Sequence, residues 1–395
     1  MKTKYIADSL IGGVTIDDEF ILDLYMTKEF KRLARVNHLG IVHFIYPMAK
    51  HYRLEHSLGV YELTRRVLVK LEAYKLVPED TYRAVLAAAL LHDLGHGPFS
   101  HLFELVSGYD HEEYSVDIIS SSETEVYKVF EKHSPSSREQ VVQILQGKHP
   151  VPWCNQLISS EVDMDRLDYL LRDSESTGAA YGQVDWRWLM KNARIHKETQ
   201  QLVFKEKALP VIESILLGRY HMNVSVYWNP KNVANQQLYK FWWLRMKELY
   251  RTDKLVHQYA FLEKVLKDEK MTTEEFNKLD DTMFYSALRY SLEERDEHIK
   301  IIADMLLRHE LPIRVFGDEK YDEFISSQDP ELEDQIWSTV DIPTNFKAYQ
   351  KKSASPALIL KHTGEIVSAV DESSVINFGE DEENKYKKLG VKIRE

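Results

Sequence analysis

The stretch from residue 84 to residue 101 constrains the fold more than any other part of the sequence. It reads AVLAAALLHDLGHGPFSH, an uninterrupted apolar run followed by three histidines and an aspartate. The apolar run is rich in good helix formers, so it predicts a buried helix. A histidine and an aspartate at the end of such a helix are costly to bury unless hydrogen bonds, an opposite charge or a metal ion satisfies them. The fold must therefore bring a partner to this place.

Histidines are concentrated around this stretch, and the neighbouring motifs are rich in carboxylates. Eight of the 16 histidines lie between positions 38 and 111, namely residues 38, 43, 51, 56, 92, 96, 101 and 111. Carboxylates accompany them in DHEEYS at 110–115 and in SEVDMDRLDYLLRDS at 160–174. Each histidine alone could be an ordinary core or surface residue. Together they indicate a site that holds a cation.

Imidazole nitrogens and carboxylate oxygens are the donors that divalent transition metals take in proteins. Two histidines and two aspartates of these motifs could supply two of each donor: His56, His92, Asp93 and Asp165. An ion that prefers six ligands would keep two positions open for water or phosphate oxygens, which is the condition for catalysis. Such a mixed set suits Mn, Fe, Co, Zn or Ni and does not choose among them.

Apolar residues recur at the spacing of a helix through most of the chain. The segments with this pattern are 17–36, 58–76, 81–94, 161–173, 186–193, 209–226, 236–266 and 293–309. Runs typical of strands appear only late, at 312–316 and at 357–370, where a His-Thr-Gly turn separates two of them. We therefore predict a mostly α fold with a helical core over residues 1–311. A small α+β region would follow over 312–395 and end in a charged, solvated tail.

Charge and cysteine content narrow the classes of function. The 51 basic and 63 acidic residues give a net charge of −12, which disfavours nucleic acid and anionic membranes as partners. No segment approaches the ~20 apolar residues of a membrane-spanning helix, and the start of the sequence lacks the apolar core of a signal peptide. The single cysteine, Cys154, suits a reducing compartment and is a weak candidate for a nucleophile. We expect a cytoplasmic protein.

Several longer motifs occur together and in a fixed order. They are FKRLARVNHLG at 30–40, IYPMAKHYRLEHSLGV at 45–60, HDLGHGPFSH at 92–101, HEEYS at 111–115 and DMDRLDYLLRDSESTG at 163–178. In this order they resemble the motifs of the HD-domain phosphohydrolases. The resemblance is strongest to the branch related to the SAM-and-HD-domain dNTP triphosphohydrolases and the bacterial dGTP triphosphohydrolases. It covers residues 10–235, with the HD motif region at 50–180, and leaves the rest of the chain without a counterpart.

The resemblance implies an enzyme that hydrolyses (deoxy)nucleoside triphosphates to nucleoside and tripolyphosphate. It makes His56, His92, Asp93 and Asp165 the ligands of one divalent transition metal per chain, and a substrate-bound Mg²⁺ is a possible second ion. A nucleotide is the expected substrate, a nucleotide effector is left open, and a homo-oligomer, either a dimer or a tetramer, is expected. Two alternatives remain. One is an HD phosphohydrolase for a nucleoside monophosphate, an alarmone or a cyclic nucleotide, and the other is a catalytically silent nucleotide sensor or nucleic-acid binder.

The same resemblance assigns roles around the phosphates. His96, His101 and His111 would line the phosphate channel. His111 would be the general acid that protonates the departing 5′ oxygen, with Glu112 orienting it. The arginines that would bind phosphate are Arg53, Arg166 and Arg219.

The nucleoside end of the site follows the family in part. Tyr169 and Asp173 would lie near the ribose, and Tyr227 would face the nucleoside. The family's usual Gln-Leu-Gly is His38-Leu39-Gly40 here, so Leu39 would still crowd the 2′ side while His38 replaces a sugar-contacting amide. Asn229-Pro230 replaces a His-Lys pair, and the proline should end the preceding helix early.

Overall fold

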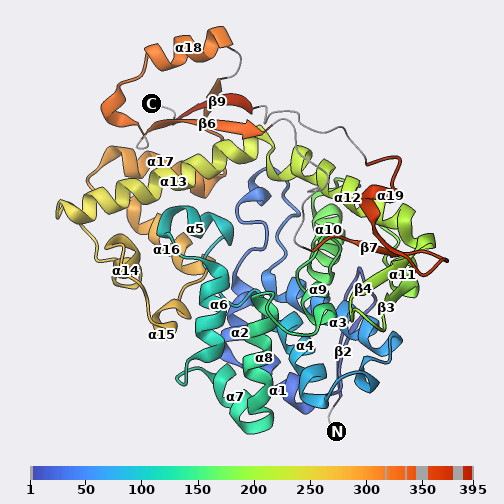
Figure 1. The fold of residues 1–395 in the computed structure, drawn as a ribbon. Helices are drawn as coiled ribbons and strands as arrows, with labels where there is room; N and C mark the ends of the chain where they lie inside the picture. Colours follow the sequence, from blue (N-terminus) through green and yellow to red (C-terminus); the bar gives the residue numbers. More distant parts are fainter. Residues whose placement is uncertain (1–2, 316–317, 334–335, 344–354, 377–385, 394–395) are drawn as a thin grey trace.

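Helices make up most of the molecule, as predicted (Figure 1). The computed structural model describes residues 3–315, 318–333, 336–343, 355–376 and 386–393. Among these residues, no helix is both long enough and apolar enough to cross a membrane.

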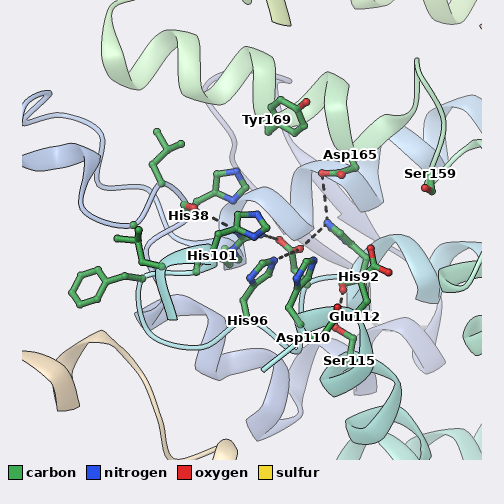
Figure 2. A pocket seen from close by; sticks show the side chains of 18 of the residues that line it. His38, His92, His96, His101, Asp110, Glu112, Ser115, Ser159, Asp165 and Tyr169 are labelled. Atoms are coloured by element: carbon green, nitrogen blue, oxygen red, sulfur yellow. Dashed lines mark hydrogen bonds and ion pairs between the residues drawn. The ribbon is translucent and has the colours of Figure 1, made fainter. Parts of the chain in front are cut away.

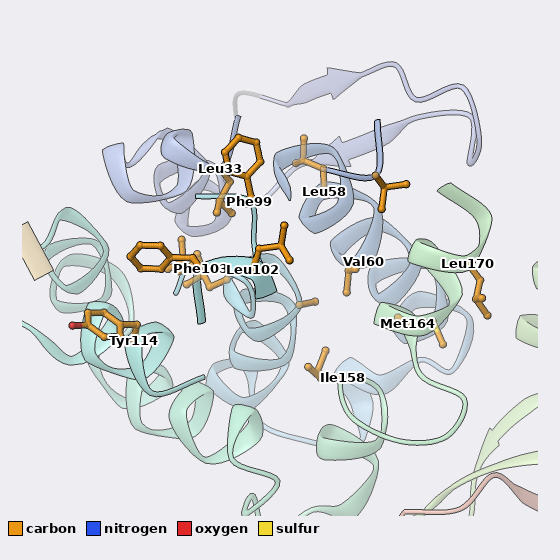
Figure 3. Packing of buried hydrophobic residues seen from close by; sticks show 14 of the residues in the cluster. Leu33, Leu58, Val60, Phe99, Leu102, Phe103, Tyr114, Ile158, Met164 and Leu170 are labelled. Atoms are coloured by element: carbon orange, nitrogen blue, oxygen red, sulfur yellow. The ribbon is translucent and has the colours of Figure 1, made fainter. Parts of the chain in front are cut away.

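Two helices at the centre of the fold carry the first histidine motifs. They are α3 (Arg53–Lys70) and α4 (Glu79–Leu91), and they pack against each other. The predicted buried run is confirmed, since every residue from Ala84 to Leu91 is buried. On the outside, α10 (Met164–Thr177) packs on α3, and α8 (Pro135–Leu145) packs on α4. Figure 3 shows the apolar side chains that α3 and α10 contribute to the core, including those of Val60 and Met164.

The predicted helix over 17–36 is divided into three parts. They are α1 (Glu19–Met26), α2 (Lys28–Arg32) and a 3₁₀ turn (Leu33–Arg35). Thr27 causes the first break, because its extended backbone ends α1 and its hydroxyl accepts a hydrogen bond from Phe30 N at the start of α2. A threonine that caps a helix competes with the continuation of the helix before it.

The helix predicted over 236–266 is interrupted after residue 251 and resumes only in a 3₁₀ turn (Ala260–Leu262) and α14 (Glu263–Leu266). Helix α13 (Pro230–Arg251) ends before the interruption, and Asp253 adopts a left-handed backbone that stops the helical pattern. The effect predicted for Pro230 is confirmed. Helix α12 (Leu209–Met222) continues only as a π turn (Asn223–Tyr227), and Pro230 occupies the first turn of α13, where its missing N–H is tolerated.

The remaining helices are short and cover the core. They are α5 (His101–Ser107), α6 (His111–Ser120), α7 (Glu125–His133), α9 (Pro152–Gln156), α11 (Trp186–Asn192), α14 (Glu263–Leu266), α15 (Thr273–Phe276), α16 (Asp281–Ser291), α17 (Glu297–Arg308), α18 (Asp318–Ser326) and α19 (Ala369–Glu372).

Three small sheets lie at the edges of the helical body. The first pairs β1 (Lys4–Ile6) with β2 (Val14–Ile16). The second has the order β3-β4-β7-β8, with bounds Ala193–Ile195, Leu202–Lys205, Leu358–Leu360 and Ile366–Ser368. The third has the order β5-β9-β6, with bounds Ile313–Val315, Tyr386–Lys392 and Trp337–Pro343. The strand predicted at 312–316 and the hairpin predicted at 357–370 are both present.

The C-terminal region is more closely joined to the core than its sequence pattern indicates. Strand β7 pairs in parallel with β4, so strands from both sides of residue 311 share one sheet. The division of the chain at residue 311 stays a prediction. The expectation of a solvated tail is wrong for Tyr386–Lys392, because this segment is β9, the central strand of its sheet, and Leu389 and Val391 are buried. The tail residues 380–385 and 394–395 lie outside the described residues.

Candidate active site

A cavity of about 930 Å³ opens where α3, α6, α10 and α12 meet the turn that follows α4. Most of the predicted site residues line it, and Figure 2 shows that their side chains come from opposite walls. Asp165 and Tyr169 project from α10 on one side. His92, His96, His101 and Glu112 project from the other side. The structure therefore brings together motifs that lie far apart in the sequence, from His38 to Tyr227.

Three donor atoms converge on one point of the cavity wall, and the Asp93 carboxylate lies beside them. His56 Nε2 lies 3.0 Å from Asp165 Oδ1, and His92 Nε2 lies 3.2 Å from His56 Nε2 and 3.7 Å from Asp165 Oδ1. Asp93 lies next to these three donors, with Oδ1 3.4 Å from His92 Nε2 and Oδ2 3.6 Å from His56 Nε2. Donors about 2.1 Å from one ion are separated by roughly 3.0–3.4 Å, so His56, His92 and Asp165 can hold a divalent transition metal ion, and Asp93 is near enough to be the proposed fourth ligand.

The far side of each imidazole is already engaged. His56 Nδ1 lies 2.9 Å from Asp168 Oδ2, and His92 Nδ1 lies 3.0 Å from the Ala89 carbonyl oxygen. A neutral ring that donates from Nδ1 presents its Nε2 lone pair to a metal ion, so the Nε2 atoms of His56 and His92, 3.2 Å apart, can both bind one cation. Asp168 also pairs with Arg172, so the carboxylate that contacts His56 is itself held by an arginine.

The electrostatics of the cluster show the same demand for positive charge. Burial alone would lower the pKa of His56, but Asp165 and Asp168 raise it to about 10. Burial would raise the pKa of Asp93, yet the Arg53 guanidinium and His92 hold it well below its usual range. Without an ion the site takes up protons, and an ion that binds there displaces them.

Three further histidines form a second cluster beside the first. The His96 and His111 rings stack with centroids 4.0 Å apart, and the His101 ring meets both edge-on at 4.8 and 5.1 Å. All three line the cavity, in accordance with the predicted phosphate channel. They differ in exposure, because His96 is buried while the His101 side chain is 66% exposed.

The carboxylate that contacts His111 is Glu104, not Glu112. Glu104 Oε1 lies 2.9 Å from His111 Nδ1 and 3.1 Å from His101 Nδ1. In the described part of the chain, no hydrogen bond or ion pair joins the Glu112 side chain to His111, so the orienting role of Glu112 stays a prediction without a contact in this structure. Neighbouring residues on a helix point in directions about 100° apart, which agrees with the two side chains having different partners.

Arg53 lies within the cluster, and its charge is engaged by protein groups. Its side chain is buried, its Nη1 pairs with Asp93 Oδ2, and its Nε donates to Ser100 Oγ at 2.8 Å. The guanidinium also lines the cavity, which keeps the predicted phosphate contact possible. Arg219 lines the cavity as well. Arg166 does not belong to the described lining residues and donates to Asp163 at 3.2 Å.

The predicted sugar end of the site is a buried polar group. Tyr227 Oη donates to Asp173 Oδ2 at 2.6 Å, and His38 Nε2 lies 3.9 Å from Asp173 Oδ1. Leu39 and Tyr169 line the same part of the cavity. His51 also belongs to this group, because its Nε2 lies 3.0 Å from Asp173 Oδ1. The sequence assigned it no role of its own, although it stands in the histidine-rich region and two residues before Arg53.

Cys154 has no part in this site. It is fully buried, and burial raises the pKa of its thiol far above the ordinary value. A thiol in that state is a poor nucleophile, which agrees with its rejection from the sequence.

Known proteins share the motif region and the fold. The family model of the HD domain matches residues 53–173. An uncharacterized protein from Bacillus subtilis, YwfO, is 36% identical over 315 residues, which are 78% of this chain and 70% of that protein. A deoxynucleoside triphosphate triphosphohydrolase SAMHD1 homolog from Dictyostelium discoideum is 29% identical over 242 residues, 57% of this chain and 46% of that protein.

The similarity extends to a solved structure over the full length. The crystal structure of a phosphohydrolase from Bacteroides thetaiotaomicron superimposes with a TM-score of 0.86 at 27% identity and covers 100% of both chains. Sequence, fold and the histidine-aspartate cluster lead to the same assignment. The chain belongs to the HD-domain phosphohydrolase family.

Proposed function

We propose that this protein is a metal-dependent hydrolase of (deoxy)nucleoside triphosphates that releases nucleoside and tripolyphosphate. The observation that carries the proposal is the convergence of His56, His92 and Asp165, with Asp93 beside them, in a cavity lined by three more histidines. The related protein from Dictyostelium bears the name of this activity, which supports the same choice of substrate. The enzyme would work in the cytoplasm, where a single unpaired cysteine is stable.

In this proposal His56, His92, Asp93 and Asp165 hold one ion, which would supply Lewis-acid chemistry toward a phosphate ester. The metal would be Mn, Fe, Co, Zn or Ni, and a Mg²⁺ could arrive with the substrate. The other groups belong to the chain itself and act on the substrate directly.

Side chains along the cavity would bind the phosphates and supply the proton for the leaving group. Arg53, Arg219, His96 and His101 would bind the phosphates and balance their charge. His111 would donate a proton to the departing 5′ oxygen, with Glu104 holding its ring.

The sugar would bind at the other end, against Asp173, Tyr227 and His38, with Leu39 crowding its 2′ side. Tyr169 lines the path between sugar and phosphates. Arg166 would bind phosphate only after leaving Asp163. We further propose that the protein forms a homo-oligomer, as the resemblance to its family implies.

The decisive experiment incubates the purified protein with a mixed pool of dNTPs and NTPs and identifies products by mass spectrometry. Nucleoside together with tripolyphosphate is the expected result. Release of monophosphate and pyrophosphate, or hydrolysis confined to an alarmone, a cyclic nucleotide or a monophosphate, would contradict the proposed substrate class. Binding without turnover would identify a silent sensor. An Asp93→Ala preparation is the control for contaminating phosphatases.

A further inference from the structure

The turn that carries His96 and His101 has an unusual backbone. Phe99 and Ser100 are not glycines, yet their φ angles are +58° and +60°. Side chains rarely adopt this left-handed conformation, and two consecutive residues in it are strained unless the surroundings hold them. Something outside the turn must therefore fix the backbone of GPFS.

Asp281 holds it. This residue begins α16, its side chain is buried, and it lies 108 positions beyond the last residue matched by the HD-domain model. Asp281 Oδ1 accepts a hydrogen bond from Phe99 N at 2.7 Å. Asp281 Oδ2 accepts one from Asn37 N at 2.8 Å and another from Asn37 Nδ2.

The Phe99 side chain is anchored on the same helix. Its ring lies 5.1 Å from that of Phe284 and 5.5 Å from that of Tyr285, with Tyr239 of α13 at 5.8 Å, all three edge-on. The ring contacts hold the Phe99 side chain, and the hydrogen bond to Asp281 holds its backbone, mostly from α16. They explain how a phenylalanine keeps a backbone conformation that favours glycine.

From this turn a chain of contacts leads into the cluster of metal-ligand candidates. Ser100 Oγ donates to the Asn37 carbonyl oxygen at 2.6 Å and accepts from Arg53 Nε at 2.8 Å. Arg53 in turn pairs with Asp93. Asp281 therefore binds both segments, Asn37 and Phe99, that place the Ser100 hydroxyl against Arg53.

We propose that Asp281 is a positioning residue for phosphate hydrolysis. It would hold the strained Phe99–Ser100 turn, and through Ser100 it would keep the Arg53 guanidinium aimed into the cavity. This proposal rests on the proposed function in one respect, namely that Arg53 binds the phosphates during turnover. It adds to the active site a residue from outside the HD motif region, on a helix that has no hydrogen bond or ion pair with the four proposed ligands in the described structure.

The neighbouring acid provides a matched control. Asp280 caps α16 by accepting from Thr282 N at 3.0 Å, and it pairs with Arg35. Both aspartates sit at the same helix start, but in the described structure Asp280 makes no hydrogen bond with the 96–101 turn. If the start of α16 served stability alone, substitution of either aspartate would have the same effect on kcat and on exchange of the Phe99 amide.

The test compares Asp281→Asn with Asp280→Asn. An asparagine offers one acceptor oxygen, so its amide group must face one of the two backbone N–H groups that the carboxylate accepts. We expect Asp281→Asn to speed hydrogen exchange of the Phe99 amide about tenfold or more and to lower kcat by a similar factor, the scale of one buried hydrogen bond. KM and metal content should stay within about twofold of the wild type.

Asp280→Asn should lower the unfolding temperature and leave both kcat and Phe99 exchange unchanged. Ser100→Ala removes the hydroxyl that binds Arg53 but leaves the hydrogen bond between Asp281 and the Phe99 amide. This variant should therefore lower kcat while the Phe99 amide remains protected from exchange. Equal behaviour of the two aspartate variants in exchange and in kcat would overturn the inference.

The outcome does not depend on the identity of the substrate. Kinetics are measured with whichever nucleotide the wild type hydrolyses, and if it hydrolyses none, the proposed function fails while Phe99 exchange still decides whether Asp281 holds the turn. If Asp281→Asn does not fold, hydrogen exchange is measured on the wild type alone. The Phe99 amide of the wild type should exchange as slowly as the amides of α4, and rapid exchange would overturn the inference.

Discussion

The two ring nitrogens of His56 have different partners, and this division decides what the residue can bind. Asp168 engages Nδ1 at 2.9 Å, while Nε2 faces Asp165 at 3.0 Å. The outer carboxylate sets the orientation of the ring and increases its basicity. The other nitrogen of His56, Nε2, points into the proposed metal site. In His92 the Ala89 carbonyl oxygen engages Nδ1 in the same way and leaves Nε2 for the site.

Asp93→Ala should remove both bound metal and activity. Asp93 contributes an oxygen to the proposed ligand set and is the partner of Arg53, so its loss leaves a cation site with too little negative charge. Elemental analysis should find about one transition-metal ion per chain in the wild type and far less in the variant. Asp117→Ala is the control, since Asp117 lines the cavity but pairs with Lys270. Equal metal content in wild type and Asp93→Ala would refute the ligand assignment.

Glu104→Gln should shift the pH dependence of turnover. Burial lowers the pKa of His111, but the Glu104 carboxylate more than compensates and leaves that pKa above its ordinary value. A general acid works only while protonated, so the rate falls as pH rises through its pKa. Without the carboxylate the pKa of His111 drops, and the loss of kcat on the alkaline side should begin at lower pH. A pH-rate profile measures this.

The comparison with His111→Ala completes that test. Removing the acid itself should lower kcat by roughly 10²- to 10⁴-fold at every pH and leave metal content unchanged. If Glu104→Gln shows the wild-type profile while His111→Ala is inactive, then Glu104 does not control the proton of His111.

His38→Gln should change the preference between deoxy and ribo substrates. His38 and Asp173 lie at the proposed sugar end, and burial holds the pKa of His38 well below its ordinary value. A neutral ring can contact a hydroxyl through one hydrogen bond, so exchanging it for an amide should alter the ratio of kcat/KM values severalfold, about 1 kcal/mol. Leu39→Ala should relax the same ratio by opening space. Unchanged ratios in both variants would place the sugar elsewhere.

Among the elements, β9 is a central strand whose charged residues made its sequence resemble a solvated tail. Lys387 and Lys388 are exposed at its start, whereas Leu389 and Val391 are fully buried between β5, β6 and α18. The strand pairs with β6 over seven residues and with β5 over three. The first part of the strand is therefore exposed, while Leu389, Gly390 and Val391 are buried in the core.

Leu389→Ala should destabilise the protein by about 2–5 kcal/mol, the usual loss for a buried leucine. Thermal unfolding followed by circular dichroism measures the change. Lys387→Ala, in the same strand and exposed, should alter stability by no more than about 0.5 kcal/mol. A large loss in the lysine variant, or none in the leucine variant, would contradict the central place of β9.

At the scale of the whole molecule, the proposed metal site joins three parts of the fold. His56 lies on α3, His92 and Asp93 follow α4, and Asp165 lies on α10. An ion held by all three binds the native state and has no comparable site in the unfolded chain. It therefore contributes its binding free energy to folding.

Removal of metal by a chelator should consequently lower the unfolding temperature. The shift should increase with the concentration and affinity of the ion added back, following the linkage between binding and stability. Asp93→Ala should unfold at the same temperature with and without added metal. A wild type whose unfolding does not respond to metal would show that the ion, if bound, does not join the three helices.

The chemistry of the site and the helices that carry it were predictable from the chain alone. Helical periodicity and the apolar run before His92 are local patterns, and each depends on residues within a few turns of one another. His92 and Asp93 could be named because histidine and aspartate have few roles at the end of a buried helix. Helices α4 and α10 follow the predicted segments within four residues, whereas α3, which carries His56, begins five residues before the start of the predicted segment and ends six residues before its end.

Tertiary structure alone decided which side chains meet. Glu104, not the adjacent Glu112, contacts His111, because the direction of a side chain depends on how α5 packs against α6. His51 joins Asp173 across two elements, and β9 becomes a central strand only through its partners. Asp281 reaches the Phe99 amide from 182 positions away. Contacts between distant segments depend on the free energy of the whole packed core, and no local pattern of residues carries that information.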